Sequence, residues 1–127
     1  MSLVRRAVPE DAEEVLRLRQ VMIDALPGGD SSTDRPGALA ALVVGTVDYR
    51  IGKAGNPRGL AGYVFSVATD PQARRRGYAR ACMDELLAWF RERGAGQVML
   101  TASPEAEPLY ASLGFVHKPD PTMMLKL

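Results

Sequence analysis

The segment Val64-Phe-Ser-Val-Ala-Thr-Asp-Pro-Gln-Ala-Arg-Arg-Arg-Gly-Tyr-Ala-Arg-Ala-Cys-Met-Asp-Glu-Leu-Leu-Ala-Trp89 decides the fold, because it joins a β-rich run to a helical pattern through a basic turn. The β-rich run ends at Asp70 and Pro71, and helical spacing begins after Gly77. Backbone N–H groups at the start of a helix have no partner within it, and the helix dipole is positive there. The segment therefore predicts a strand, a turn and a helix that form a site for a phosphate or pyrophosphate group.

The composition indicates one globular domain. The chain has 127 residues, and its 16 Lys and Arg against 15 Asp and Glu give no general reason to expect nucleic acid or an anionic membrane as a partner. Cys82 is the only cysteine and has no histidine at metal-ligand spacing, so we expect neither an internal disulfide nor a metal. Apolar runs fall short of the roughly 20 residues of a membrane span, and the N-terminus lacks a signal-peptide pattern. We therefore expect a cytoplasmic protein.

The first half of the chain predicts a short strand, a helix and a hairpin. The strand covers residues 3–8, and an amphipathic helix begins at Pro9 and ends near Gly28. Residues 28–37 carry no apolar side chain to bury and predict a mobile loop. Strands over residues 39–51 and 60–69 follow, and the turn-rich link between them predicts antiparallel pairing.

The second half predicts two further helices and several short strands. A helix covers residues 73–93, a strand covers residues 97–102, and a short helix begins near Ser103 and ends at Gly114. Residues 115–117 and 122–126 are candidate closing strands. This order of elements predicts a mixed α/β fold, in which helices cover the faces of a mixed sheet.

The basic turn contains the motif Arg-x-x-Gly-x-Ala over residues 74–79. It lacks the Gly-Lys-Ser or Gly-Lys-Thr of a P-loop and the Gly-x-Gly-x-x-Gly of a dinucleotide site. Gly77 allows the backbone to approach a ligand closely, and Ala79 keeps the first helical turn thin. The alternative interpretation is a solvated basic turn or a weak nucleic-acid patch.

This motif resembles the acetyl-coenzyme A (acetyl-CoA) binding motif of the GCN5-related N-acetyltransferase (GNAT) superfamily, which reads Gln/Arg-x-x-Gly-x-Gly/Ala after a strand and an Asp-Pro. A second marker over residues 108–115 is similar to the family's Leu-Tyr-x-x-x-Gly-Phe ending. The motifs support the resemblance over about residues 60–118. In the remainder of the chain the resemblance rests on the order of the elements alone. It implies a single GNAT domain over residues 1–127, with a central mixed, mostly antiparallel sheet and helices on both faces. Compared with the family, the chain is abbreviated between the first helix and the central strands.

The resemblance also implies the cofactor site. The acetyl-CoA pantetheine arm would lie in a gap between the strands over residues 60–69 and 97–102, along backbone groups of the first of them. Amides of the basic turn would hold the pyrophosphate, and Arg74 matches the family's Gln/Arg position. The implied cofactor-binding residues are Val67, Ala68, Thr69, Arg74, Arg75, Arg76, Gly77, Tyr78, Ala79 and Arg80.

Tyr110 is the catalytic candidate that the resemblance implies, as a general acid that protonates the departing thiolate of coenzyme A. The alternative is a tyrosine that only packs the short helix. A general base is left open, because Tyr63 stands where some family members carry a glutamate. Cys82 is interpreted as a core residue. The other side chains considered for the base are Thr101, Ser103, Glu105, Glu107 and His117.

The resulting hypothesis is an N-acetyltransferase that moves an acetyl group from acetyl-CoA to an amine of a small molecule or peptide, by direct transfer in a ternary complex. No nucleic-acid or membrane partner is expected, and a homodimer is one way to complete the acceptor wall. The alternative from another class is a coenzyme A-binding regulatory or sensor module without turnover. Further alternatives are a different acyl donor, a hydroxyl acceptor, or a nucleic-acid accessory domain.

Overall fold

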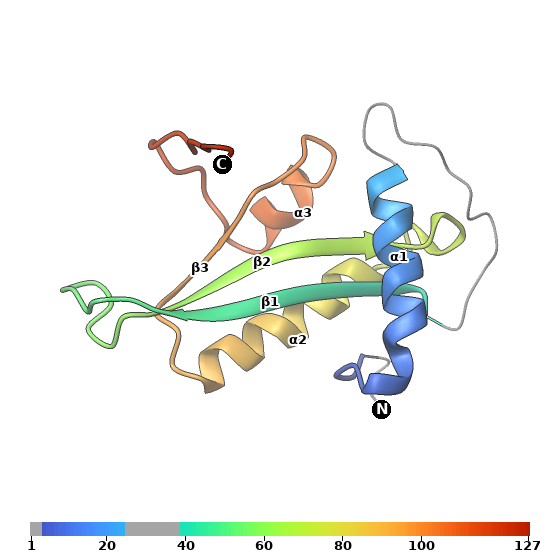
Figure 1. Ribbon diagram of the computed structural model, residues 1–127, viewed down its shortest axis with the longest axis horizontal. Helices are drawn as coiled ribbons and strands as arrows, with labels where there is room; N and C mark the ends of the chain where they lie inside the picture. The colour runs from blue at the N-terminus through green and yellow to red at the C-terminus, as the bar shows by residue number, and fades with distance from the viewer. Residues whose placement is uncertain (1–3, 25–38) are drawn as a thin grey trace.

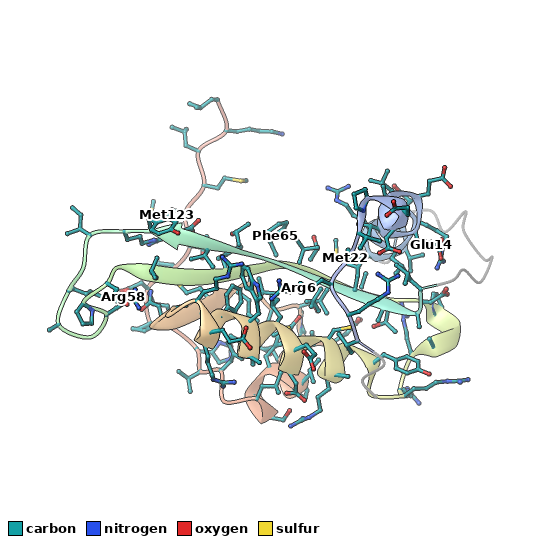
Figure 2. The ribbon with its side chains drawn as sticks, turned by 90° about the horizontal axis from the view of Figure 1, so that it is seen from below. Arg6, Glu14, Met22, Arg58, Phe65 and Met123 are labelled. Carbon is teal, nitrogen blue, oxygen red and sulfur yellow. The ribbon has the colours of Figure 1, made fainter. Side chains whose placement is uncertain are left out.

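The computed structural model describes residues 4–24 and 39–127, in which a three-stranded sheet has helices on both faces (Figure 1). Seen along the edge of the sheet, α1 lies on one face and α2 on the other (Figure 2). None of the helices in these two stretches is both long and apolar enough to cross a bilayer. The elements in chain order are a 3-10 turn (Pro9–Asp11), α1 (Ala12–Asp24), β1 (Ala41–Tyr49), β2 (Leu60–Thr69), a 3-10 turn (Pro71–Ala73), α2 (Tyr78–Glu92), β3 (Gln97–Leu100) and α3 (Glu107–Ser112).

Strands β1 and β2 form the predicted antiparallel hairpin. The bounds of β2 coincide with the prediction, and β1 is two residues shorter at each end than the predicted strand. The Arg50 N–H donates to the Gly59 carbonyl over 2.7 Å and closes the hairpin beyond the last strand pair. The hairpin therefore confirms the central part of the predicted sheet.

A β-bulge at Phe65 changes which face each β2 side chain takes. Val64 pairs with Gly45 while Ser66 pairs with Val44, so Phe65 is an extra residue without a partner on β1. Before the bulge Val64 packs toward α2, and after it Ala68 packs toward α1. One strand thereby serves two cores. The core under α2 and α3 contains Val64, Met83, Leu87, Phe90 and Tyr110, and the core under α1 contains Leu18, Leu42 and Ala68.

Strand β3 runs parallel to β2 but pairs with only its first half. The ladder begins at Ala61 with Gln97 and ends at Val64 with Leu100. Beyond that pair the two strands diverge (Figure 1). The divergence leaves β2 residues 65–69 without a strand on that side within the described chain, which confirms the predicted gap.

Two sets of predicted strands are wrong. Residues 4–8 form no strand in the described chain, because the Val8 N–H donates to an Asp11 carboxylate oxygen over 2.9 Å and Asp11 also pairs with Arg5. These contacts fix the start of the helix, and residues 4–8 do not pair with another strand. Residues 115–117 and 122–126 also form no strand. The turn with Pro119 and Pro121 lacks two backbone donors, and the final residues stay exposed.

Three predictions fall on residues that the structure does not describe. They are the end of the first helix near Gly28, the polar loop over residues 28–37, and the abbreviation that follows the first helix. The described part of α1 ends at Asp24 and β1 begins at Ala41. Within α1, Leu18 is fully buried and Val15 and Met22 are partly buried, as the amphipathic pattern predicts.

Gly62 lies where β2 crosses the aromatic ring of Phe90. A Cβ atom at Gly62 would stand 2.8 Å from Cε1 of Phe90, a side chain that is 1% exposed. We expect Gly62→Ala to lower the free energy of unfolding by about 1–3 kcal/mol, measured by urea denaturation, because a closely packed core cannot accept the added atom without shifting. Gly55→Ala is the matched control, since a Cβ there meets nothing within 4 Å. Equal stability of the two variants would contradict the prediction.

Candidate functional site

The basic turn between β2 and α2 interrupts the helix that the sequence predicts to begin at Ala73. Residues Pro71–Ala73 form a 3-10 turn, and α2 begins only at Tyr78. The interruption has a backbone cause, because Arg75 has φ +64° and Gly77 has φ +79°. Both values lie in the left-handed region, which glycine adopts freely and arginine adopts at a cost of about 1–2 kcal/mol. The predicted start at Ala73 is therefore wrong by five residues, whereas the helical spacing predicted after Gly77 agrees with α2.

The turn presents a run of backbone amides that have no acceptor. The first backbone hydrogen bond of α2 runs from the Ala81 N–H to the Gly77 carbonyl, over 3.0 Å. Within the described chain, the N–H groups of residues 77–80 donate no backbone hydrogen bond. Because these groups lie at the positive end of the α2 dipole, the turn is a strong candidate for binding an anion.

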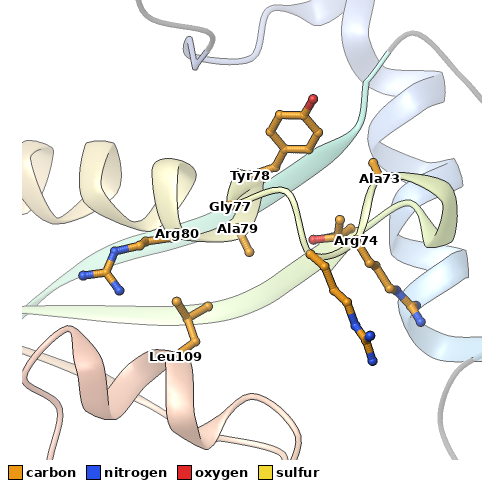
Figure 3. A pocket seen from close by; sticks show the side chains of 9 residues that line it. Ala73, Arg74, Gly77, Tyr78, Ala79, Arg80 and Leu109 are labelled. Atoms are coloured by element: carbon orange, nitrogen blue, oxygen red, sulfur yellow. The ribbon is translucent and has the colours of Figure 1, made fainter.

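A hollow of about 210 Å³ lies beside these amides. Leu109 of α3 and Ala79 of α2 point toward one another across it, whereas the Tyr78 ring points to the other side (Figure 3). A Cβ atom at Gly77 would meet nothing within 4 Å, so the backbone there is open to a ligand. The side chains that line the hollow include three arginines and no carboxylate, which fits a diphosphate group. The residues that line the hollow are Thr69, Ala73, Arg74, Arg75, Gly77, Tyr78, Ala79, Arg80 and Leu109.

Most of the residues predicted to bind the cofactor meet at this hollow. Three of the predicted residues do not line it: Val67 packs against the α2 core, Ala68 is buried under α1, and Arg76 is exposed. Backbone contacts, which are what the sequence predicts for Val67 and Ala68, do not require their side chains to face the hollow. Ala73 and Leu109 line it without having been predicted, although Leu109 belongs to the second sequence marker.

The Arg80 side chain connects the start of α2 to α3. Its guanidinium donates to the Ser112 hydroxyl over 2.7 Å, and that hydroxyl donates to the Leu109 carbonyl over 2.6 Å. These contacts hold the two sequence markers together. Arg80 therefore acts as a link between the basic turn and the helix that carries Tyr110.

Tyr110 is buried at the centre of the α2 core. Its side chain is 6% exposed, and its ring meets the Phe115 ring edge to face at a centroid distance of 5.9 Å. The same buried cluster contains Val64, the last β2 residue that pairs with β3. Within the described chain the Tyr110 hydroxyl has no hydrogen-bond partner. Burial raises the pKa of the phenol, so the side chain keeps its proton at neutral pH.

A buried ion pair fixes the point where β2 enters the basic turn. Arg17 of α1 donates to an Asp70 carboxylate oxygen over 3.1 Å and to the Leu39 carbonyl over 3.0 Å. Glu14 accepts from Arg17 over 2.8 Å, and this hydrogen bond is the main cause that raises the pKa of Arg17. Asp70 is 5% exposed. The network therefore ties α1 to the end of β2, next to the candidate anion site.

The candidate bases are surface groups. His117 Nε2 lies 2.9 Å from Glu107 Oε1, but the two side chains are 88% and 42% exposed. The Tyr63 hydroxyl lies 3.4 Å from Thr101 Oγ1, which is a long hydrogen bond. Ser103 and Glu105 are exposed in the loop that precedes α3. None of these contacts joins a candidate base to Tyr110.

Cys82 is half-buried in α2. Burial raises the pKa of its thiol, which keeps the sulfur in the less nucleophilic protonated form. The interpretation of Cys82 as a packing residue therefore agrees with its surroundings.

Comparison with known proteins identifies a family. The model of the acetyltransferase (GNAT) family matches residues 29–115. Glucosamine 6-phosphate N-acetyltransferase 1 of Oryza sativa subsp. japonica is 31% identical over 117 residues, which cover 87% of this chain and 67% of that protein. A GCN5-related N-acetyltransferase from Ralstonia eutropha JMP134 superposes with a TM-score of 0.78 at 24% identity, over 95% of this chain and 96% of its own. A predicted acetyltransferase from Clostridium acetobutylicum, in a crystal structure with acetyl-CoA, has a TM-score of 0.76 at 19% identity, with 95% and 94% covered.

Proposed function

The chain belongs to the GNAT family of acetyltransferases, and from this we propose that it transfers the acetyl group of acetyl-CoA directly to an amine of a small molecule or peptide, in a ternary complex. The observation that carries the proposal is the run of unbonded amides over residues 77–80, beside a hollow with three arginines and no carboxylate. A curated relative that the chain resembles is named for an amine acceptor, glucosamine 6-phosphate.

On the donor side, we assign the basic turn to the pyrophosphate. The amides of residues 77–80 would hold its oxygens, and the guanidinium groups of Arg74 and Arg75 would add positive charge. The free side of β2 over residues 65–69 would align the pantetheine arm in the gap beside β3. Bound acetyl-CoA supplies the thioester that acylates the amine.

On the acceptor side, Tyr110 is our candidate for the proton donor to the sulfur. A phenol that stays protonated at neutral pH and has no hydrogen-bond partner in the described chain keeps a proton that it can donate, although the side chain is 6% exposed and does not line the hollow. An amine that arrives uncharged needs orientation more than a strong base.

Gly77→Val tests the donor site. Acetyl-CoA at 100 times its Kd should stabilise the wild-type protein by about 2.7 kcal/mol, seen as a rise in Tm by differential scanning fluorimetry. The valine should abolish most of this rise, because its side chain occupies open space beside the amides and its backbone resists φ +79°.

Gly114→Val is the matched control for that experiment. Gly114 has φ +100°, and a Cβ there also meets nothing within 4 Å, but the residue does not line the hollow. Its variant should lose intrinsic stability and keep the rise in Tm with acetyl-CoA. A wild-type protein that shows no rise would overturn the donor site, and a rise without thiol release in any amine mixture would favour the sensor module.

A further inference from the structure

The sheet face opposite α2 has exposed side chains at Thr46 and Asp48, although Ala61 on the same face is 3% exposed. The strand register identifies the side chains of this face, which we call the open face. On the other face, Gly45 and Gly62 lie against the Phe90 ring of α2. Because neighbouring residues of a strand take opposite faces, the residues next to them point away from α2. Two rows of directly paired residues therefore share the open face. They are Thr46, Tyr63 and Met99 in one row, and Asp48, Ala61 and Gln97 in the other.

An aromatic pair forms the middle of this face. The Tyr63 and Phe65 rings stack at a centroid distance of 6.5 Å with 18° between their planes. Phe65 is 53% exposed and lies on the α1 side of the sheet (Figure 2). Tyr63 is held by its hydroxyl contact with Thr101. We call Tyr63, Phe65 and Met99 the aromatic shelf.

The aromatic shelf lies at the mouth of the gap between β2 and β3. Phe65 is the bulge residue, and it directly follows Val64, where the pairing with β3 ends. The hollow with the arginines begins at the other end of this unpaired stretch, at Thr69. A molecule resting on the aromatic shelf would therefore stand at the opposite end of the gap from the anion site.

The six paired residues of the open face offer no cation to a phosphate group. Of the six paired residues that share the face, Asp48 is the only charged one, and none is a cation. A phosphorylated acceptor is normally bound by arginine or lysine. The exposed ring of Phe65 offers instead a surface on which a planar apolar group can stack.

We propose that the aromatic shelf binds the acceptor and selects an amine with an aromatic body over a phosphorylated amino sugar. The inference rests on the proposed acetyl transfer and adds a substrate class to it. The aromatic body stacks on Phe65, and its aminoalkyl arm extends into the gap toward the thioester. The bulge makes this surface available, since the Phe65 side chain belongs to neither core.

The test compares kcat/KM for 2-phenylethylamine, n-propylamine and glucosamine 6-phosphate, measured as thiol release from acetyl-CoA. The wild-type enzyme should prefer 2-phenylethylamine to glucosamine 6-phosphate. Phe65→Ala should lower kcat/KM for 2-phenylethylamine by about tenfold or more and leave n-propylamine within about twofold, because only the first loses a stacking partner. Phe65→Trp should restore the preference.

Tyr49→Ala is the control, since Tyr49 is 85% exposed and lies outside the aromatic shelf. It should leave all three values unchanged. A higher kcat/KM for glucosamine 6-phosphate, or an equal loss for both simple amines in Phe65→Ala, would overturn the inference while leaving acetyl transfer intact. Thiol release with none of the three amines would overturn the inference, and thiol release with no amine in a broad mixture would contradict the proposed function as well.

Discussion

Tyr110→Phe should lower kcat by about 10² to 10⁴ fold while the KM for acetyl-CoA stays within about twofold. The substitution keeps the ring that packs beside Val64 and Phe115 and removes only the hydroxyl. Because that hydroxyl has no partner in the described chain, its loss should leave the free energy of unfolding almost unchanged. Steady-state kinetics together with urea denaturation separate a loss of proton donation from a loss of folding.

The pH dependence gives a second readout for Tyr110. Burial raises its pKa above the ordinary value of 10.0, so the phenol stays protonated as the pH rises from about 7 to about 9. The ratio of wild-type to variant kcat should therefore stay constant over that range. Tyr49→Phe, at an exposed tyrosine, is the control and should keep full activity. An unchanged kcat in Tyr110→Phe would show that the tyrosine only packs α3.

Arg17→Met should destabilise the protein by about 3–5 kcal/mol, which corresponds to a fall in Tm of roughly 10–20 °C. The substitution leaves the Asp70 carboxylate buried without its cation, and the Asp70 side chain is only 7% exposed. Differential scanning calorimetry measures the effect. Asp70→Asn in the same background should recover part of the loss, because the uncharged amide costs less to bury.

Arg5→Met is the matched control, because the Arg5 side chain is 58% exposed in its pair with Asp11. Solvent screens an exposed pair, so this variant should keep a Tm close to that of the wild-type protein. If Arg17→Met and Arg5→Met shift the Tm equally, the ion pair with Asp70 does not anchor α1. A loss of stability in Arg17→Met that Asp70→Asn does not reduce would also contradict the assignment.

The sequence predicts the elements that local pattern determines. The alternation and turn signals around residues 60–69 place β2 correctly, and the spacing of Met83, Leu87 and Phe90 identifies the buried side of α2. The basic turn and the second marker also predict most of the hollow, since both markers line it. These features depend on neighbouring residues, which a single sequence contains.

The remaining features depend on distant contacts or on backbone angles. Arg75 has φ +64° in the turn before α2, a value that nothing in a run of three arginines indicates. The bulge at Phe65 is visible only once β2 is aligned with β1. The closing strands near Val116 and Met124 have suitable composition but no paired edge in the described chain. A strand needs a neighbouring strand to pair with as well as a suitable pattern of residues.

The bulge at Phe65 also has an evolutionary consequence. Val64 and Ala68 are each constrained by the helix that covers them, so both strand length and side-chain volume are restricted on either side of the bulge. Phe65 itself is held by its backbone position and contributes its side chain to neither core. Substitution of the ring at this position is therefore separable from folding, whereas an insertion or deletion there would shift the register of both cores. Under the proposed role of the aromatic shelf, acceptor preference could change through this one residue.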